Sequence, residues 1–462
     1  MDHKKLQSWG VRGLIITGMC ISFQGVAFGQ TLYELLPDVL QTHDKIRAAG
    51  TDLEATKESA NAVNAAWYPT LDFKWNAGHE TQDKDPSAVN THAGFWETTL
   101  TAKQLVWDFG KTSATTARAG LMTGKSSLML ESTRQQVLLE ATEAYFNLLR
   151  AVESMGYAMR SESNIKQQTN LEEARVERGR GIAADVLQAK STLAGAMAMR
   201  VQAQGGVDAA SNRYRSVFKR EVGDMSTFRR PLTPYDKLPQ NLEEAIEIAL
   251  ANNLNMKMAQ VDIQSAQETV KVDESTLYAA KIDATLQGSS KDSVGGVMGR
   301  KEEYLAKVEL NIPLFAGGKD QATYRASSNS AASTISRKDD LARSVEEQVR
   351  NAWQALRTQR DNAFFLRNQA NISGEFLDMA RKERQMGRRS LLDILNSETG
   401  YINSVSAAVS AETDTSLAVY RLLFVMGQLD PELFGTSESD DAVAARAKDG
   451  AAVGSDGAAT AK

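Results

Sequence analysis

The sequence predicts an α+β membrane protein in which three chains share a twelve-stranded β-barrel that continues into a long barrel of α-helical coiled coil. Three observations support this fold class: an internal two-fold repeat, two very long segments without proline, and four alternating segments of membrane-spanning length that follow an export signal. The two repeats are predicted at residues 30–220 and 241–430. A linker at residues 221–240, which contains three of the eight prolines, separates them.

The composition excludes several classes of protein. The 462 residues carry a formal net charge of −5, whereas nucleic-acid binding needs a basic surface. The four histidines are not spaced as metal ligands, and no nucleophile lies in a recognisable pattern with a base. We therefore expect no nucleic-acid partner, no cofactor or metal site, and no enzyme activity.

The N-terminus, residues 1–29, has the layout of a secretory signal peptide. A basic start precedes a short apolar stretch, and Ala27-Phe28-Gly29 has the small-x-small pattern of a cleavage site. The alternative is a membrane anchor, which the shortness of the apolar stretch disfavours. The single cysteine, Cys20, lies inside this segment, so the exported chain is expected to have no disulfide.

Two landmarks recur 208 residues apart, which indicates a duplication. The glycine-to-aspartate stretch at 179–185 recurs at 387–393, and Gly110 is matched by Gly318. In each half, the two landmarks lie 69 residues apart, with no proline between them. A helix of this length would extend for about 100 Å. The residues expected at the junctions between strands and long helices are Gly110, Pro313, Gly317 and Gly318.

The first repeat begins with a predicted helix at residues 31–66, which Pro69 ends. A strand hairpin is predicted at 70–106, because apolar and polar residues alternate on both sides of a polar loop. Each strand is long enough to cross a bilayer at a tilt. A soluble hairpin would be the better interpretation if there were no signal peptide. Four tryptophans in or beside the hairpin resemble the aromatic girdle of a membrane barrel: Trp67, Trp75, Trp96 and Trp107.

The rest of the chain repeats one order of elements. After the first hairpin we expect a long helix at 111–178 and a return helix from Asp185 to about Arg220. The second repeat is expected to contain a helix at 241–276, a strand hairpin at 281–313, a long helix at 319–386 and a return helix at 391–428. A C-terminal tail at 431–462 has the composition of a disordered segment.

Four strands cannot close a barrel, for which about eight are the practical minimum. An open sheet edge cannot face lipid, because unpaired backbone groups there cost several kcal/mol each. Other copies of the chain must therefore supply the missing strands, and a homotrimer would close a barrel of twelve. The loops at 80–93 and 290–300 are expected on the cell exterior, where barrel loops are longer.

The chain resembles the outer-membrane efflux protein (TolC) family over nearly all of residues 31–430. The resemblance rests on Asn-Leu-Glu-Glu-Ala at 241–245, on Ile-Pro-Leu-Phe-Ala-Gly-Gly at 312–318, and on the two glycine-to-aspartate turns. It implies a β-barrel in the outer membrane of a Gram-negative bacterium and an α-barrel that extends into the periplasm. It also implies that substrate passes from an inner-membrane pump, through a periplasmic adaptor, to the outside.

The resemblance also implies a constricted periplasmic tip at the turns formed by Gly179, Gly181 and Gly387. Asp185 and Arg389 fall where the family has a latch that holds the tip shut, and Arg384 falls where many members have tyrosine. Asp393 matches an aspartate that lines the entrance as a ring, and Asn396 falls where a second ring aspartate is common. The alternative is that Asp185 and Asp393 only cap the return helices.

Three functions remain open from the sequence. The leading one is the outer-membrane channel of type I protein secretion, for adhesin-like or RTX-like substrates, driven by an ABC exporter. The same fold would serve as the outer-membrane channel of a multidrug or metal efflux system, in which a proton-driven pump supplies the energy. A structural coiled-coil surface protein is a distant third. The lack of a lipoprotein cysteine favours secretion, since many drug-efflux members of the family carry one.

Overall fold

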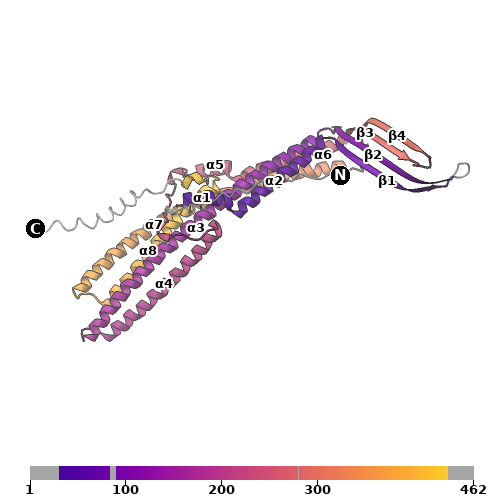
Figure 1. Ribbon diagram of the computed structural model, residues 1–462. Coiled ribbons are helices and arrows are strands. Elements are labelled where there is room, and N and C mark those ends of the chain that lie inside the picture. Colours follow the sequence, from indigo (N-terminus) through magenta and orange to yellow (C-terminus); the bar gives the residue numbers. More distant parts are fainter. Residues whose placement is uncertain (1–30, 84–89, 279, 435–462) are drawn as a thin grey trace, which may run out of the picture.

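The computed structural model describes residues 31–83, 90–278 and 280–434 and shows an elongated molecule (Figure 1). A β-sheet lies at one end and long helices run from it. The turns of two helical hairpins lie at the other end. The predicted signal peptide, residues 1–29, lies outside the described residues. The part of the predicted tail beyond residue 434 also lies outside them. Residues 431–434, the first four of that predicted tail, form a short helix, so the predicted boundary of the tail was placed four residues too early.

The elements of the first repeat follow one another from the helices near the centre to the sheet and back. They are α1 (Leu32–Thr42), α2 (Asp44–Asn64), η1 (Ala65–Trp67), β1 (Thr70–Gln82), β2 (Thr91–Trp107), α3 (Lys111–Glu177) and α4 (Ala183–Phe218). Among the residues that the structure describes, none of the helices combines the length and the hydropathy of a transmembrane helix.

A linker with two short helices, η2 (Met225–Thr227) and η3 (Tyr235–Lys237), leads to the second repeat. The second repeat has the same order of elements. They are α5 (Leu242–Asn252), α6 (Leu254–Tyr278), β3 (Lys281–Asp292), β4 (Arg300–Asn311), α7 (Lys319–Gln385), α8 (Leu391–Val425) and η4 (Pro431–Phe434).

The prediction of one continuous helix at the start of each repeat was wrong. His43 separates α1 from α2 with extended backbone, and its Nδ1 accepts a 3.3 Å hydrogen bond from the amide of Lys45. Asn253 separates α5 from α6, and its Oδ1 accepts a 2.9 Å bond from the amide of Asn255. Each side chain starts the next helix as a cap. Burial lowers the pKa of His43, which favours the neutral ring that can accept this bond.

The sheet has the antiparallel order β1-β2-β3-β4, and its two faces differ in chemistry. The register places Phe73 opposite Leu100, and Leu286 opposite Ala306, on one face, which we call the apolar face. The other face carries lysines and carboxylates, and we call it the charged face. A bulge between Leu105 and Trp107 shifts the register so that Trp107 lies opposite Ile282, on the apolar face. The sheet is therefore built to separate an apolar from a polar surrounding.

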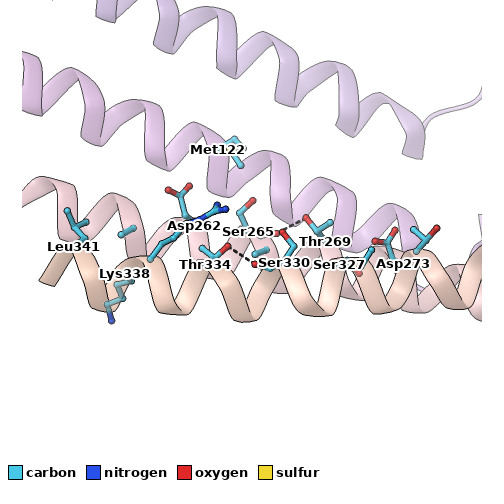
Figure 2. Close-up of a pocket in the computed structure, with 15 residues that line it drawn as sticks. Met122, Asp262, Ser265, Thr269, Asp273, Ser327, Ser330, Thr334, Lys338 and Leu341 are labelled. Atoms are coloured by element: carbon cyan, nitrogen blue, oxygen red, sulfur yellow. Dashed lines mark hydrogen bonds between the residues drawn. The ribbon is translucent and has the colours of Figure 1, made fainter. Parts of the chain in front are cut away.

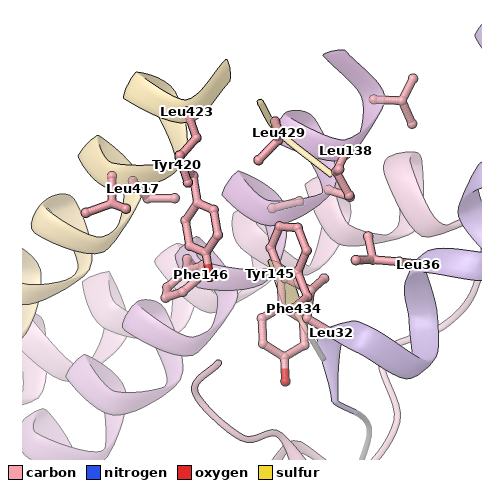
Figure 3. Packing of buried hydrophobic residues seen from close by; sticks show 14 of the residues in the cluster. Leu32, Leu36, Leu138, Tyr145, Phe146, Leu417, Tyr420, Leu423, Leu429 and Phe434 are labelled. Carbon is pink, nitrogen blue, oxygen red and sulfur yellow. The ribbon is translucent and has the colours of Figure 1, made fainter. Parts of the chain in front are cut away.

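The main hydrophobic core lies at the middle of the molecule, where α1, α3, α4, α5 and α8 meet (Figure 3). Tyr420 stacks on Phe434 with ring centres 5.0 Å apart, and Tyr145 stacks on Phe228 at 5.4 Å. The Tyr145 hydroxyl donates to the carbonyl of Arg229 at 2.7 Å and accepts from its amide at 3.2 Å. These bonds fix the linker between the repeats onto the core, and burial raises the pKa of Tyr145.

We predict that Tyr145→Phe lowers the free energy of unfolding by about 1–3 kcal/mol, because the backbone groups of Arg229 lose their buried partner. The matched control is Tyr214→Phe, since the buried Tyr214 hydroxyl has no hydrogen-bond partner among the described residues. That variant should be neutral or stabilising. The melting temperature of the detergent-solubilised protein tests both. Equal losses would show that the hydroxyl bonds do not hold the linker.

Candidate functional site

The two long helices end in the same kind of turn, and both turns lie at the end of the molecule away from the sheet (Figure 1). Gly179 follows α3 and Gly387 follows α7, each with a φ of 72°, a left-handed conformation that glycine adopts easily. In each turn, the residue after the glycine donates a 2.9 Å bond to the carbonyl five residues earlier. This is the Schellman motif, so the duplication preserves the backbone of the tip.

The two turns differ at the second position after this glycine. A Cβ atom on Gly181 would lie 2.6 Å from Cγ2 of Val176, so a larger residue would require that side chain to move. The second repeat has Arg389 at the matching position. The backbone is therefore repeated, but only the second turn presents a long cationic side chain here.

Asp185 and Asp393 do not cap their helices. The cap of α8 is Ser390, whose Oγ accepts a 3.1 Å bond from the amide of Asp393, and Ile182 before α4 makes no side-chain cap. Each aspartate lies in the first turn of its helix, where the helix dipole favours a negative charge. The capping alternative is therefore wrong, and both carboxylates are left for other contacts.

Asp185 and Arg389 do not meet within one chain. The Arg389 Nε lies 2.8 Å from Oε2 of Glu383, and its guanidinium lies 4.9 Å from the centre of the Phe376 ring. Asp185 has no ion-pair partner among the described residues of its own chain. A latch between these two residues would need two copies of the chain.

Arg384 instead joins the two helical hairpins directly. Its Nη2 lies 2.8 Å from Oε2 of Glu172 on α3, and its Nη1 donates a 3.1 Å bond to the carbonyl of Arg389. Only 7% of the Glu172 side chain and 21% of the Arg384 side chain are exposed. The pair is shielded from water, so it is stronger than a surface ion pair.

A second buried carboxylate, Glu398 on α8, connects three helices. Its Oε2 lies 2.6 Å from Nη2 of Arg381 on α7, and its Oε1 accepts a 2.6 Å bond from Asn164 on α3. Only 5% of its side chain is exposed. We call Glu172, Arg384, Glu398, Arg381 and Asn164 the hairpin link. Arg384 bonds Glu172 and Glu398 bonds Asn164 across the boundary between the α3–α4 and α7–α8 hairpins, while Arg381 holds Glu398 from within the α7–α8 hairpin.

The sequence did not indicate most of the hairpin link. Arg384 was singled out by its place in the family pattern, but Glu172 and Glu398 are ordinary acidic residues in polar helices. Their burial follows from how the hairpins pack, and one sequence contains no signal of it. A buried carboxylate facing arginine from another helix became visible only in three dimensions.

Asp393 and Asn396, the predicted entrance residues, lie together on the exposed side of α8. They line a cavity of 330 Å³ with Arg389, Phe376 and the ring of Tyr401. The cavity is open and has acidic, cationic and aromatic walls. The entrance ring at Asp393 and Asn396 stays a prediction.

The junctions between sheet and helices combine glycine conformations with one carboxylate. Gly110 and Gly318 precede α3 and α7 with φ of 94° and 79°, and Gly317 has φ of 66°. Asp108 accepts a 2.8 Å bond from the amide of Thr112 and so caps the start of α3. Pro313 follows the end of β4, where its missing N–H costs no strand pairing.

A groove of 790 Å³ lies beside α6 and α7 (Figure 2), and it does not have the features of a catalytic site. Thr269 and Thr334 donate to backbone carbonyls one helical turn earlier. Asp262 is held at 2.6 Å by Lys125. Among the described residues, no cluster of histidine, cysteine and acidic side chains could hold a metal ion.

Comparison with known proteins gives consistent matches along most of the chain. The family model "Outer membrane efflux protein" matches residues 35–217 and 245–428, so each repeat is matched once. The chain is 24% identical to the outer membrane efflux protein BepC of Brucella suis over 424 residues, 92% of this chain and 90% of the relative. It is 23% identical to the alkaline protease secretion protein AprF of Pseudomonas aeruginosa, over 93% and 90% of the two chains.

The fold matches solved outer-membrane channels. The CmeC outer membrane channel of Campylobacter jejuni superposes with a TM-score of 0.75 at 13% identity, covering 90% of this chain and 88% of that chain. The predicted fold class, a membrane sheet of four strands per chain continuous with a long helical barrel, is thereby confirmed. The chain belongs to the outer membrane efflux protein family, and it is a channel of the Gram-negative outer membrane rather than an enzyme.

Proposed function

We propose that this channel is the outer-membrane conduit of type I protein secretion. The observation that carries the proposal is the full-length similarity to AprF, a relative named for alkaline protease secretion. Such a conduit is passive, so an inner-membrane ABC exporter supplies the energy and a periplasmic adaptor connects the two. Such a conduit needs a continuous passage and performs no chemical step.

The proposed assembly is a homotrimer whose barrel contacts outer-membrane lipid. Trp75 and Trp107 are 63% and 56% exposed in one chain, and they lie on the apolar face together with Trp96. Eleven residues separate Trp96 from Trp107, which is about 36 Å along a strand and about 25 Å along the axis of a barrel tilted by about 45°. This matches the height of a lipid-facing band, and Trp67 adds to its helical end.

The second candidate is a multidrug or metal efflux conduit coupled to a proton-driven pump. The similarity to BepC, a relative named as an efflux protein, favours it to a comparable degree. Both functions use the same barrel and the same tip, so they differ in the substrate and in the inner-membrane partner.

Deletion of the gene in its host distinguishes the two functions. We predict that the deletion strain fails to release one or more large proteins into the medium, while its susceptibility to drugs and metals is unchanged. A plasmid copy should restore release. Mass spectrometry of the medium and minimal inhibitory concentrations are the two measurements. Normal release with increased susceptibility would exclude secretion as the main function and support efflux.

We propose that the hairpin link is the gate that keeps the periplasmic tip closed. Opening a helical tip requires one packed hairpin to shift against another, rather than local unfolding. Arg384 and Glu172 join the two hairpins of one chain, whereas Arg389 is held by Glu383 and Asp185 is left to act between neighbouring copies. Gating would then break a few buried polar bonds and leave each hairpin intact.

The variant Glu172→Gln tests this gate. It removes a charge that faces Arg384, so we predict a loss of about 1–3 kcal/mol from the closed state and a clear rise in conductance in planar bilayers. The matched control is Glu173→Gln, because Glu173 pairs with Lys190 at 2.7 Å within the α3–α4 hairpin and should not affect the gate. An equal response from both variants would contradict the proposal. A response only from Asp185→Ala would locate the latch between copies.

We further propose that Asp393 and Asn396 line the entrance in three copies. Three like charges around a narrow axis attract multivalent cations strongly, so Asp393→Asn should weaken channel block by a trivalent cation. The control is Asp361→Asn, which removes the same charge from an exposed position on α7 outside the hairpin link. Concentration series of the blocking cation give the measurement. Equal weakening by both variants would show a general surface effect and no ring.

A further inference from the structure

The charged face of the sheet is neutralised within the chain, except on β1. Every charged side chain on this face of β2, β3 and β4 has an ion-pair partner; for example, Lys291 lies 3.3 Å from Glu97 and 3.0 Å from Glu303. On β1, Glu80 has no ion pair but accepts hydrogen bonds from Gln82 and from the amide of Gly295, whereas Asp72 and Lys74 have neither an ion pair nor a hydrogen bond to any side chain among the described residues. The ion-paired side chains are Glu97, Lys103, Lys281, Asp283, Lys291, Lys301, Glu303, Lys307 and Glu309.

Both unpartnered charges lie on an open edge of the sheet. β1 and β4 are the two edge strands, and barrel closure in the proposed trimer pairs β1 of one copy with β4 of the next. The two strands meet antiparallel, with the apolar faces continuous. Only every second alignment satisfies this, because a shift by one residue would turn each side chain to the opposite face.

The tilt of the strands restricts the alignment further. Within the chain, Thr70 lies level with Lys103, Thr285 and Lys307. In the trimer, Lys307 faces a residue on β1 of the next copy that lies an even number of positions after Thr70. We call this number the displacement. Displacements of 2, 4, 6 and 8 residues correspond to tilts of about 20°, 35°, 45° and 55° for strands about 4.8 Å apart with a rise of about 3.3 Å. Barrel strands tilt by about 35–45°, so displacements of 4 and 6 remain.

Charge distinguishes the two remaining alignments. At a displacement of 4, Lys74 would face Lys307 and Asp72 would face Glu309, which are two like-charge pairs in direct opposition. At a displacement of 6, Lys74 faces Glu309 and Asp72 faces the amide of Asn311. The second alignment gives both unpartnered charges of β1 a complementary neighbour.

One pair at the exterior end has the opposite preference. A displacement of 6 brings Glu80 opposite Glu303, whereas a displacement of 4 would bring it opposite Lys301. Both carboxylates are already satisfied, however. Glu303 is paired with Lys291, and Glu80 accepts a 2.8 Å bond from the amide of Gly295. Within the chain, Asp283 lies opposite Glu309 and Lys291 lies opposite Lys301, so the sheet accommodates like charges in opposition when both members have other partners. Asp72 and Lys74 have no other side-chain partners among the described residues of the chain, so their contacts decide the alignment.

We propose that Lys74 of one copy pairs with Glu309 of the next, and that this contact sets the register in which three copies close the barrel. The proposal rests on the trimeric assembly proposed above. It assigns a role to the two charges that one chain leaves without partners. It also makes the barrel wall incomplete without side chains from a neighbouring copy.

Cysteine cross-linking tests the register. In the cysteine-free background Cys20→Ser, the variant Lys74→Cys with Glu309→Cys should form disulfides between copies, since directly opposed residues have Cα atoms about 4.5–5.5 Å apart. The matched control, Lys74→Cys with Lys307→Cys, places the cysteines on a diagonal about 7–8 Å apart, beyond disulfide reach. After mild oxidation, a non-reducing denaturing gel should show covalent trimers for the first variant and monomers for the control.

Two outcomes would overturn the register. One is preferential cross-linking of the control pair, and the other is no cross-linking of either pair in a sample that native mass measurement shows to be trimeric. A sample without trimers would instead contradict the proposed assembly itself. Charge exchange gives a second measurement: Lys74→Glu should lower the temperature at which the trimer dissociates, and adding Glu309→Lys should restore it. Failure of the exchange to restore stability would also count against the pair.

Discussion

A backbone amide or carbonyl without a hydrogen bond costs several kcal/mol in lipid, and the rest of this structure depends on that constraint. The sheet has only four strands and ends in two open edges, β1 and β4. Satisfying those edges requires other copies, and the copies bring their helices together in a ring. The long helices α3 and α7 then carry the same symmetry from the membrane to the tip. Thus hydrogen bonding in the bilayer determines which helical surfaces can meet far outside it.

Much of the fold could be predicted because it follows from periodic signals. Alternation predicts the strands, the lack of proline predicts the two long helices, and the repeated glycines predict the tip turns. The breaks at His43 and Asn253 were missed, because the apolar pattern continues across them and only a side-chain cap reveals the interruption. The bulge at Leu105 was missed for a related reason, since one extra residue in a strand leaves the alternation nearly unchanged.

The candidate site was less predictable than the fold. Family resemblance located the tip and drew attention to Arg384, but it also suggested that Asp185 and Arg389 belong together. In the chain, Arg389 is held by Glu383, and the bonds between hairpins involve Glu172 and Glu398. Which carboxylate an arginine meets depends on the relative rotation of two packed helices. A difference of one helical position changes the partner, and no local pattern in the sequence encodes that rotation.

The position of the main core has a consequence for how such a channel can change over time. The large buried aromatic residues Tyr145, Tyr214 and Tyr420 gather at mid-length, whereas the distal hairpins are joined across their boundary by the few polar side chains of the hairpin link and by smaller apolar clusters. With the hairpin link as the proposed gate, folding stability and the ease of opening are supplied by different parts of the chain. Under that proposal, substitutions at the tip adjust the channel to a new pump or cargo while the fold is retained, so the evolution of specificity is separated from the risk of misfolding.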